Sequence, residues 1–155
     1  MLTLRRHQLN HGRWALLASF VLYCVALTQC EFSAGGDCQT GIDVATFGWV
    51  QVFAAEQIGI LSAGAWFANP CLWVSWILSV RAMPRQALGM GALGLLCALG
   101  LLGASEFVIG GIESPTPISH LGPGYWLLLA SLMCGIASAT LAAPAKPIGK
   151  AQRDL

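Results

Sequence analysis

The sequence predicts an all-α membrane protein, a four-helix transmembrane bundle with both termini in the cytoplasm. Of its 155 residues, 56% are hydrophobic and only 10% are charged, with a mean hydropathy of +0.68, which lies outside the usual balance of a soluble domain. Four apolar stretches approach the roughly 20 residues that a helix needs to cross a bilayer. All eight Lys and Arg residues can be placed on one side of the membrane, as the positive-inside rule requires.

The four apolar stretches use up most of the chain and leave no room for a soluble catalytic domain. We therefore expect a single integral membrane domain over residues 1–155. The first and third stretches are short for a bilayer, so their ends must borrow interfacial residues or thin the bilayer locally. The predicted spans cover residues 14–29, 58–80, 87–104 and 125–142.

The basic residues set the predicted orientation. The loops at roughly 30–57 and 105–123 contain no Lys or Arg and are therefore expected outside. The basic start of the first span also fits a cleaved signal peptide, but Gln29 is a poor residue before Cys30 at such a site, and we expect the span to be retained. The basic residues lie before the first span (Arg5, Arg6, Arg13), between the second and third (Arg81, Arg85) and after the fourth (Lys146, Lys150, Arg153).

The first outer loop divides into a polar loop over 31–41 and an apolar, aromatic segment near 43–56. Two interpretations of the apolar segment remain open: a helix lying in the outer interface, or an extension of the second span. One helix over 44–80 would be about 55 Å long at 1.5 Å per residue. Because that length exceeds the bilayer, a bend or a surface segment is required.

Small residues recur at helical spacing on three of the spans. Such stripes let helix backbones approach closely in lipid, where packing drives association. We expect each stripe to form a groove for a neighbouring helix. The stripes are Gly64, Ala68, Cys71 and Ser75 in the second span, Ala87, Gly91, Gly94 and Ala98 in the third, and Ser131, Gly135, Ser138 and Ala142 in the fourth.

Asn69 lies near the middle of the second span, directly before Pro70. Proline removes one helical hydrogen bond and leaves the carbonyl of Trp66 without its usual donor. One interpretation is a kink whose polar groups are satisfied by Asn69 and a neighbouring helix. The other is a ligand site in which Trp66 and Trp73 flank the amide and hold a flat lipophilic molecule such as a quinone, or a lipid.

Two of the six cysteines, Cys30 and Cys38, fall in the first outer loop. We expect a structural disulfide between them, contributing about 2–3 kcal/mol. The alternative is redox activity, although such chemistry usually uses a tighter Cys-x-x-Cys. The other cysteines lie in the spans and are most simply small packing residues, namely Cys24, Cys71, Cys97 and Cys134.

Acidic residues concentrate outside, where they form either a solvated polar rim or a surface for a cationic partner. No ionisable residue lies within the core of a span, which argues against a proton relay or an ion pump. No metal-ligand motif is present, and we expect neither a metal nor a cofactor. The predicted outer acids are Glu31, Asp37, Asp43, Glu56, Glu106 and Glu113.

The stretch Ala65-Trp66-Phe67-Ala68-Asn69-Pro70 resembles the W-x-A-N-P stretch of small, functionally uncharacterised four-pass bacterial inner-membrane proteins. The segment from Gly124 to Ser131 is similar to the start of their last helix. The resemblance implies a bacterial inner-membrane location and supplies no activity. Quinone-linked disulfide oxidoreductases share the four-pass layout, but their Cys-x-x-Cys is missing here.

The leading functional hypothesis is a non-enzymatic scaffold or accessory subunit that packs against another membrane protein or a second copy of itself. The small-residue stripes and the absence of a buried ionisable group motivate it. Lipid is an expected partner and nucleic acid is not. The alternatives are a quinone- or lipid-binding protein that uses the Trp66, Asn69 and Trp73 face, and a thiol–disulfide redox protein that uses Cys30 and Cys38.

Overall fold

The structure is a computed structural model and describes residues 2–53, 60–104, 106–107 and 116–143. Several residues with a predicted role lie outside this part of the chain. They are the first two residues of the second span, the predicted outer acids Glu56 and Glu113, the basic residues Lys146, Lys150 and Arg153, and the side chains of Arg5 and Arg6.

Within the described part of the chain, four helical segments are long and apolar enough to cross a membrane, as the sequence predicts. These apolar segments match the predicted spans to within about four residues; they are Asn10–Thr28, Ile60–Val80, Pro84–Gly103 and Pro123–Ala142. The second is interrupted by a turn at Trp66 and Phe67, next to Pro70. The helices are α1 (Leu2–Thr28), α5 (Ile60–Ala65) followed by α6 (Ala68–Val80), α7 (Pro84–Gly100) continued by the 3₁₀ turn η1 (Leu101–Gly103), and α8 (Pro123–Ala142).

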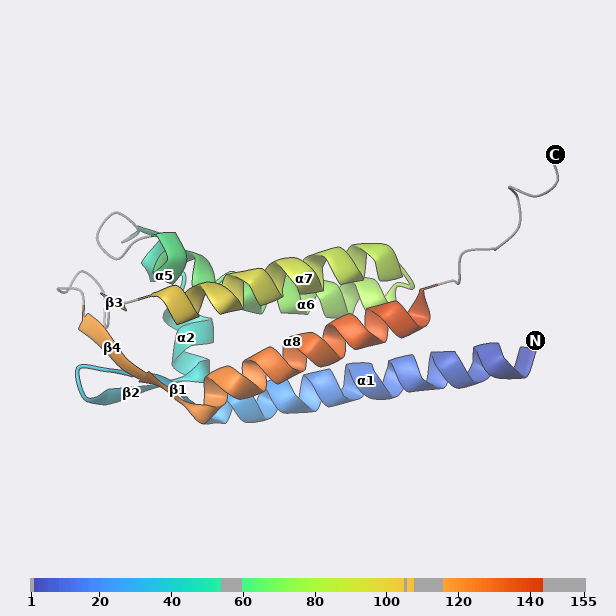
Figure 1. The fold of residues 1–155 in the computed structure, drawn as a ribbon, viewed down its shortest axis with the longest axis horizontal. Coiled ribbons are helices and arrows are strands. Elements are labelled where there is room, and N and C mark those ends of the chain that lie inside the picture. Colours follow the sequence, from blue (N-terminus) through green and yellow to red (C-terminus); the bar gives the residue numbers. More distant parts are fainter. Residues whose placement is uncertain (1, 54–59, 105, 108–115, 144–155) are drawn as a thin grey trace.

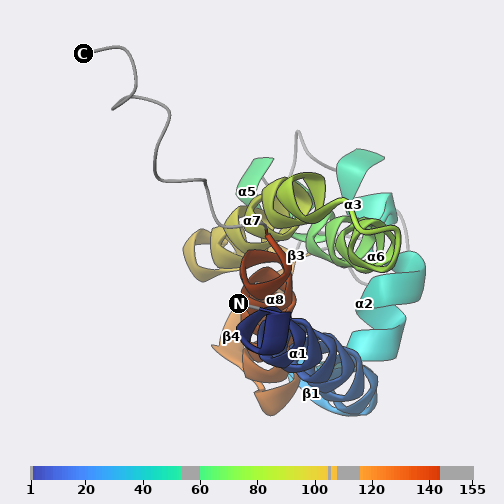
Figure 2. The same ribbon diagram turned by 90° about the vertical axis from the view of Figure 1, so that its right-hand side faces the viewer.

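The long helices pack side by side in two pairs, with α1 beside α8 and α6 beside α7 (Figures 1 and 2). Contacts between α7 and α8 join the pairs. The start of α1, the turn between α6 and α7, and the end of α8 lie at one end of the molecule (Figure 1). Arg13, Arg81 and Arg85 are exposed. The strands lie at the opposite end (Figure 1).

The fold is mostly helical, but the expectation of an all-α fold holds only in part: within the described residues, four short strands form an antiparallel sheet in the order β2-β1-β4-β3. The segment predicted to be a polar loop is a hairpin, which turns at Gly35 and Gly36 with φ of 63° and 94°. Such positive angles favour glycine and suit a two-residue hairpin turn. The strands are β1 (Cys30–Ala34), β2 (Asp37–Thr40), β3 (Glu106–Phe107) and β4 (Thr116–Leu121).

Two short helices follow the hairpin, α2 (Gly41–Phe47) and α3 (Val50–Phe53). Thr40 and Asp43 form a reciprocal capping box that starts α2, which satisfies two free backbone N–H groups. α2 runs across the ends of the long helices rather than along them (Figure 1). One continuous helix over 44–80 is therefore excluded; residues 54–59 lie outside the described part of the chain. We call the four strands with α2 and α3 the cap.

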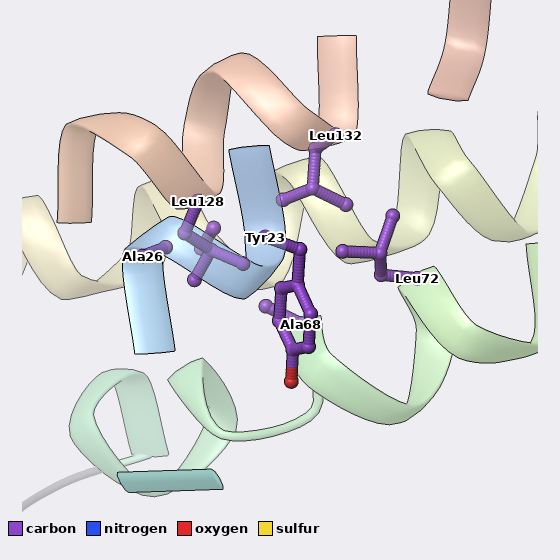
Figure 3. Close-up of a cluster of buried hydrophobic side chains, with 7 residues drawn as sticks. Tyr23, Ala26, Ala68, Leu72, Leu128 and Leu132 are labelled. Carbon is purple, nitrogen blue, oxygen red and sulfur yellow. The ribbon is translucent and has the colours of Figure 1, made fainter. Parts of the chain in front are cut away.

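The interior consists of two clusters of buried side chains. The first holds the long helices together: Tyr23 of α1 clusters with Ala68 and Leu72 of α6 and with Leu128 and Leu132 of α8 (Figure 3). The second joins the cap to the helix ends, because Phe32 of β1 and Val44 of α2 pack with residues of the long helices. Those residues are Leu101 of η1 and Tyr125 of α8.

Candidate functional site

The amide of Asn69 has its partners within the chain. Its side chain is 3% exposed. The hydroxyl of Tyr23 donates to Asn69 Oδ1 over 2.9 Å, and Asn69 Nδ2 donates to the carbonyl of Trp66 over 3.5 Å. The backbone N–H of Asn69 reaches the same carbonyl over 3.1 Å. A neighbouring helix and Asn69 thus satisfy the polar groups of the Pro70 kink, as the first interpretation of this segment expects.

The two tryptophans of the predicted ligand site occupy different surroundings. The indole N–H of Trp66 donates to the carbonyl of Ala45 in α2 over 3.3 Å, which ties the kink to the cap. Trp73 is 39% exposed and stands edge-on to Tyr23, with ring centroids 6.3 Å apart. The small cavity that Trp66 borders is lined by neither Asn69 nor Trp73. A quinone or lipid site at Trp66, Asn69 and Trp73 stays a prediction.

The small-residue stripes pack inside the chain. All of the stripe residues are buried except Gly64 and Ala142. A β-carbon at Gly94 would lie 3.0 Å from Leu132 Cδ2 and 3.1 Å from Cys71 Cβ, and one at Gly91 would lie 3.0 Å from Ile136 Cγ1. The stripes therefore bring α6, α7 and α8 together, and these residues are not left over as a groove for another protein.

Polar side chains within the apolar helices form hydrogen bonds from one helix to another. Ser19 and Ser131 each donate to the other's backbone carbonyl, over 2.8 and 2.7 Å, and so join α1 to α8. The indole of Trp76 donates to Ser19 Oγ over 2.9 Å and adds α6 to the network. Satisfied polar groups of this kind stabilise helix association where water is absent.

The cap contains the predicted disulfide. Cys30 and Cys38 are bonded across the β1–β2 hairpin, with Cα atoms 5.6 Å apart. Beside it, Ser33 Oγ lies 3.2 Å from His120 Nε2 of β4, so a side-chain contact also joins β1 to β4. The other four cysteines are free. Redox activity of the bonded pair stays a prediction.

One predicted outer acid does not belong to any solvated rim. Glu31 is only 5% exposed, because β1 lies between β2 and β4 in the sheet and packs against the ends of the long helices. Its carbonyl accepts a hydrogen bond of 2.7 Å from Gly122 N, directly before α8. A β-carbon at Gly122 would collide with the carbonyl oxygen of Cys30, so the close approach of β1 to this helix end requires glycine.

Glu31 lines a cavity of about 10 Å³, enough for roughly one water molecule. Trp66 and Tyr125 also line it, and the remaining lining residues are apolar. Among the described residues, no group donates a hydrogen bond to the Glu31 carboxyl. Burial raises the pKa of Glu31 from 4.5 to about 8, because an apolar surrounding disfavours the charged form.

The sequence predicts that Glu31 is a surface acid, because every acid outside a span is expected to reach water. The one local indication of its burial is the position of Glu31 between Cys30 and Phe32, in a short strand with few polar residues. Of the other predicted outer acids, Asp37 and Asp43 are exposed and Glu106 is half-buried. Within the described part of the chain, no three His, Cys, Asp or Glu side chains gather to hold a metal ion.

Comparisons with known proteins add no assignment: no family model, no curated protein and no solved structure matches the chain.

Proposed function

We propose that the chain is an integral protein of the bacterial inner membrane that crosses it four times, with both termini in the cytoplasm. Support comes from the four apolar segments and from the exposed Arg13, Arg81 and Arg85, which belong to the predicted inner side under the positive-inside rule. The cap then stands on the outer side, where an oxidising compartment favours the disulfide between Cys30 and Cys38.

In this proposal the protein is a non-enzymatic accessory subunit, and its cap is the surface that recognises the partner. The observation that carries this step is the burial of the small-residue stripes within the chain. The outward faces of the long helices carry large apolar side chains instead, among them Phe20, Ile77 and Leu96. Such faces suit lipid, whereas close helix–helix docking favours small residues. Recognition of another protein therefore falls to the cap.

The exposed chemistry of the cap suits a cationic partner segment. Asp37 is exposed on β2, which lies at the edge of the sheet. An edge strand offers unpaired backbone groups to a further strand, and a carboxylate on it favours an approaching Lys or Arg.

Site-specific photocrosslinking in native membranes tests this role. A photoreactive residue at Gln39 of β2 should give a discrete protein adduct, and Asp37→Lys in the same chain should abolish it. The matched control is Leu96, which is 67% exposed on α7 and should crosslink to lipid alone. Protein adducts from Leu96 but none from Gln39 would contradict the proposal, as would recovery of the protein alone and monomeric after mild extraction.

A further inference from the structure

Glu31 is an acid enclosed where the cap meets the long helices. The residue lines the small cavity described above, and its backbone carbonyl accepts a hydrogen bond from the N–H of Gly122, directly before α8. The same strand contributes Phe32 to the cluster that joins the cap to Leu101 and Tyr125. The carboxyl therefore lies in the contact that keeps the cap closed.

No cation among the described residues compensates an ionised Glu31. The titratable groups that face it are the phenols of Tyr23 from α1 and Tyr125 from α8. The hydroxyl of Tyr23 donates a hydrogen bond to Asn69 Oδ1, and that of Tyr125 donates one to the carbonyl of Ala98 over 3.1 Å. No Lys, Arg or His of the described chain lines the cavity, and His120 binds Ser33 instead.

An uncompensated carboxylate is much more costly to bury than a neutral carboxylic acid. The cavity holds at most about one water molecule, which is too few to replace the hydration of a carboxylate. The closed arrangement therefore fits the protonated acid, and ionisation requires that water reach this side chain.

We propose that Glu31 is a proton-binding site that couples closure of the cap to the pH of the surrounding solution. The cap closes over the protonated carboxyl and opens when the carboxyl is ionised. Opening would bring solvent to the ring surfaces of Phe32, Trp66 and Tyr125, which the closed cap covers.

The direction of the coupling follows from proton linkage. Burial raises the pKa of Glu31 in the closed state to about 8, from an ordinary value of 4.5, which it regains once water surrounds it. Between these two values the closed state binds the proton and the open state releases it. The equilibrium constant for opening therefore rises about tenfold per pH unit from about pH 4.5 to about pH 8. Above about pH 8 this constant no longer changes with pH.

Hydrogen exchange on the full-length protein in lipid nanodiscs tests this device. The amide of Gly122 is the reporter, because its bond to the Glu31 carbonyl must break on opening. After correction for base-catalysed exchange, the opening constant should rise about tenfold per unit in the stated range. In Glu31→Gln, which carries no titrating proton, the opening constant should be independent of pH. The matched control is Glu106→Gln on β3 of the same cap, which should retain the full dependence.

The proposal would be overturned if the opening constant of Glu31→Gln kept the pH dependence of the wild type. It would also be overturned if the opening constant of the wild type did not change with pH. Because the variant could fail to fold, infrared spectroscopy of the wild type with isotope-labelled glutamate supplies a second measurement. A protonated carboxyl band should persist at pH 6, where exposed glutamates are ionised. Its absence would equally overturn the proposal.

Discussion

The hydroxyl of Tyr23 on α1 donates a 2.9 Å hydrogen bond to the side-chain oxygen of Asn69 on α6, deep among apolar side chains. This bond explains how an asparagine is tolerated beside a proline in the middle of an apolar helix. The amide accepts from another helix and donates to the carbonyl that Pro70 leaves without its usual partner. Tyr23 thus stabilises the kink and links α1 to α6.

Tyr23→Phe should destabilise the protein by about 1–2 kcal/mol, because it leaves the oxygen of Asn69 without a donor in a dry interior. The ring itself stays packed against Trp76, whose centroid lies 5.3 Å away. Unfolding of purified protein in mild detergent measures the loss.

A double-mutant cycle with Asn69→Leu separates the hydrogen bond from packing. The coupling energy between Tyr23→Phe and Asn69→Leu should be about 0.5–1.7 kcal/mol, the range found for hydrogen bonds between helices in membranes. Additive effects of the two substitutions would show that the bond contributes nothing. Tyr23→Phe with Gly89→Ala is the matched cycle, and there additivity is expected, because nothing lies within 4 Å of a β-carbon at Gly89.

The positions of the long helices could be predicted from sequence, because hydrophobic length is a local property of the chain. The predicted span at 125–142 and the helix Pro123–Ala142 differ by two residues at one end. The partners of Asn69 could not be predicted, since Tyr23 lies 46 residues away. Different rotations of the neighbouring helices about their axes would each place a polar side chain beside Asn69, and the sequence does not distinguish between them.

Gly94→Ala should destabilise the packing of α6, α7 and α8. The added methyl would lie 3.0 Å from Leu132 and 3.3 Å from the carbonyl of Ala68, and overpacking of this kind costs about 1–3 kcal/mol. The control on the same helix is Gly89→Ala, because nothing lies within 4 Å of a β-carbon there. Gly89→Ala should be neutral or slightly stabilising through helix propensity. Equal unfolding midpoints for the two variants would contradict this account of the stripe.

The sheet escaped prediction for a different physical reason. β1 pairs with β4, so that Ser33 lies opposite His120. This pairing joins two segments that are separated along the chain by two long helices. Each strand is too short to show a reliable alternation of polar and apolar residues. Only the Gly35–Gly36 turn between Cys30 and Cys38 signals the hairpin locally. The burial of Glu31 depends on this pairing and was missed with it.

Cys38→Ser should loosen the cap without unfolding the long helices. Losing the bond to Cys30 removes about 2–3 kcal/mol of stabilisation from the hairpin. Limited proteolysis should then cleave near Gly36 faster, and the long helices should keep their helical circular dichroism. Cys24→Ser is the matched control, because Cys24 is a free, exposed cysteine of α1. Equal cleavage rates in both variants would mean that the disulfide does not restrain the hairpin.

Stability of the whole protein should fall as the pH rises from about 4.5 to about 8. Burial raises the pKa of Glu31 from 4.5 to about 8. Over this interval the folded protein retains a proton that the unfolded chain releases, so the contribution is most favourable below pH 4.5 and fully lost above pH 8. At pH 7 the loss of folding free energy relative to pH 4.5 amounts to as much as about 3 kcal/mol.

Glu31→Gln avoids this cost, so the variant should be more stable than the wild type at pH 7, and the gain should shrink toward pH 5. Unfolding in detergent at pH 5 and pH 7 measures the effect, with Asp37→Asn as the control. A gain in stability of Glu31→Gln that is equal at the two pH values would rule out titration of Glu31 as the cause of the gain.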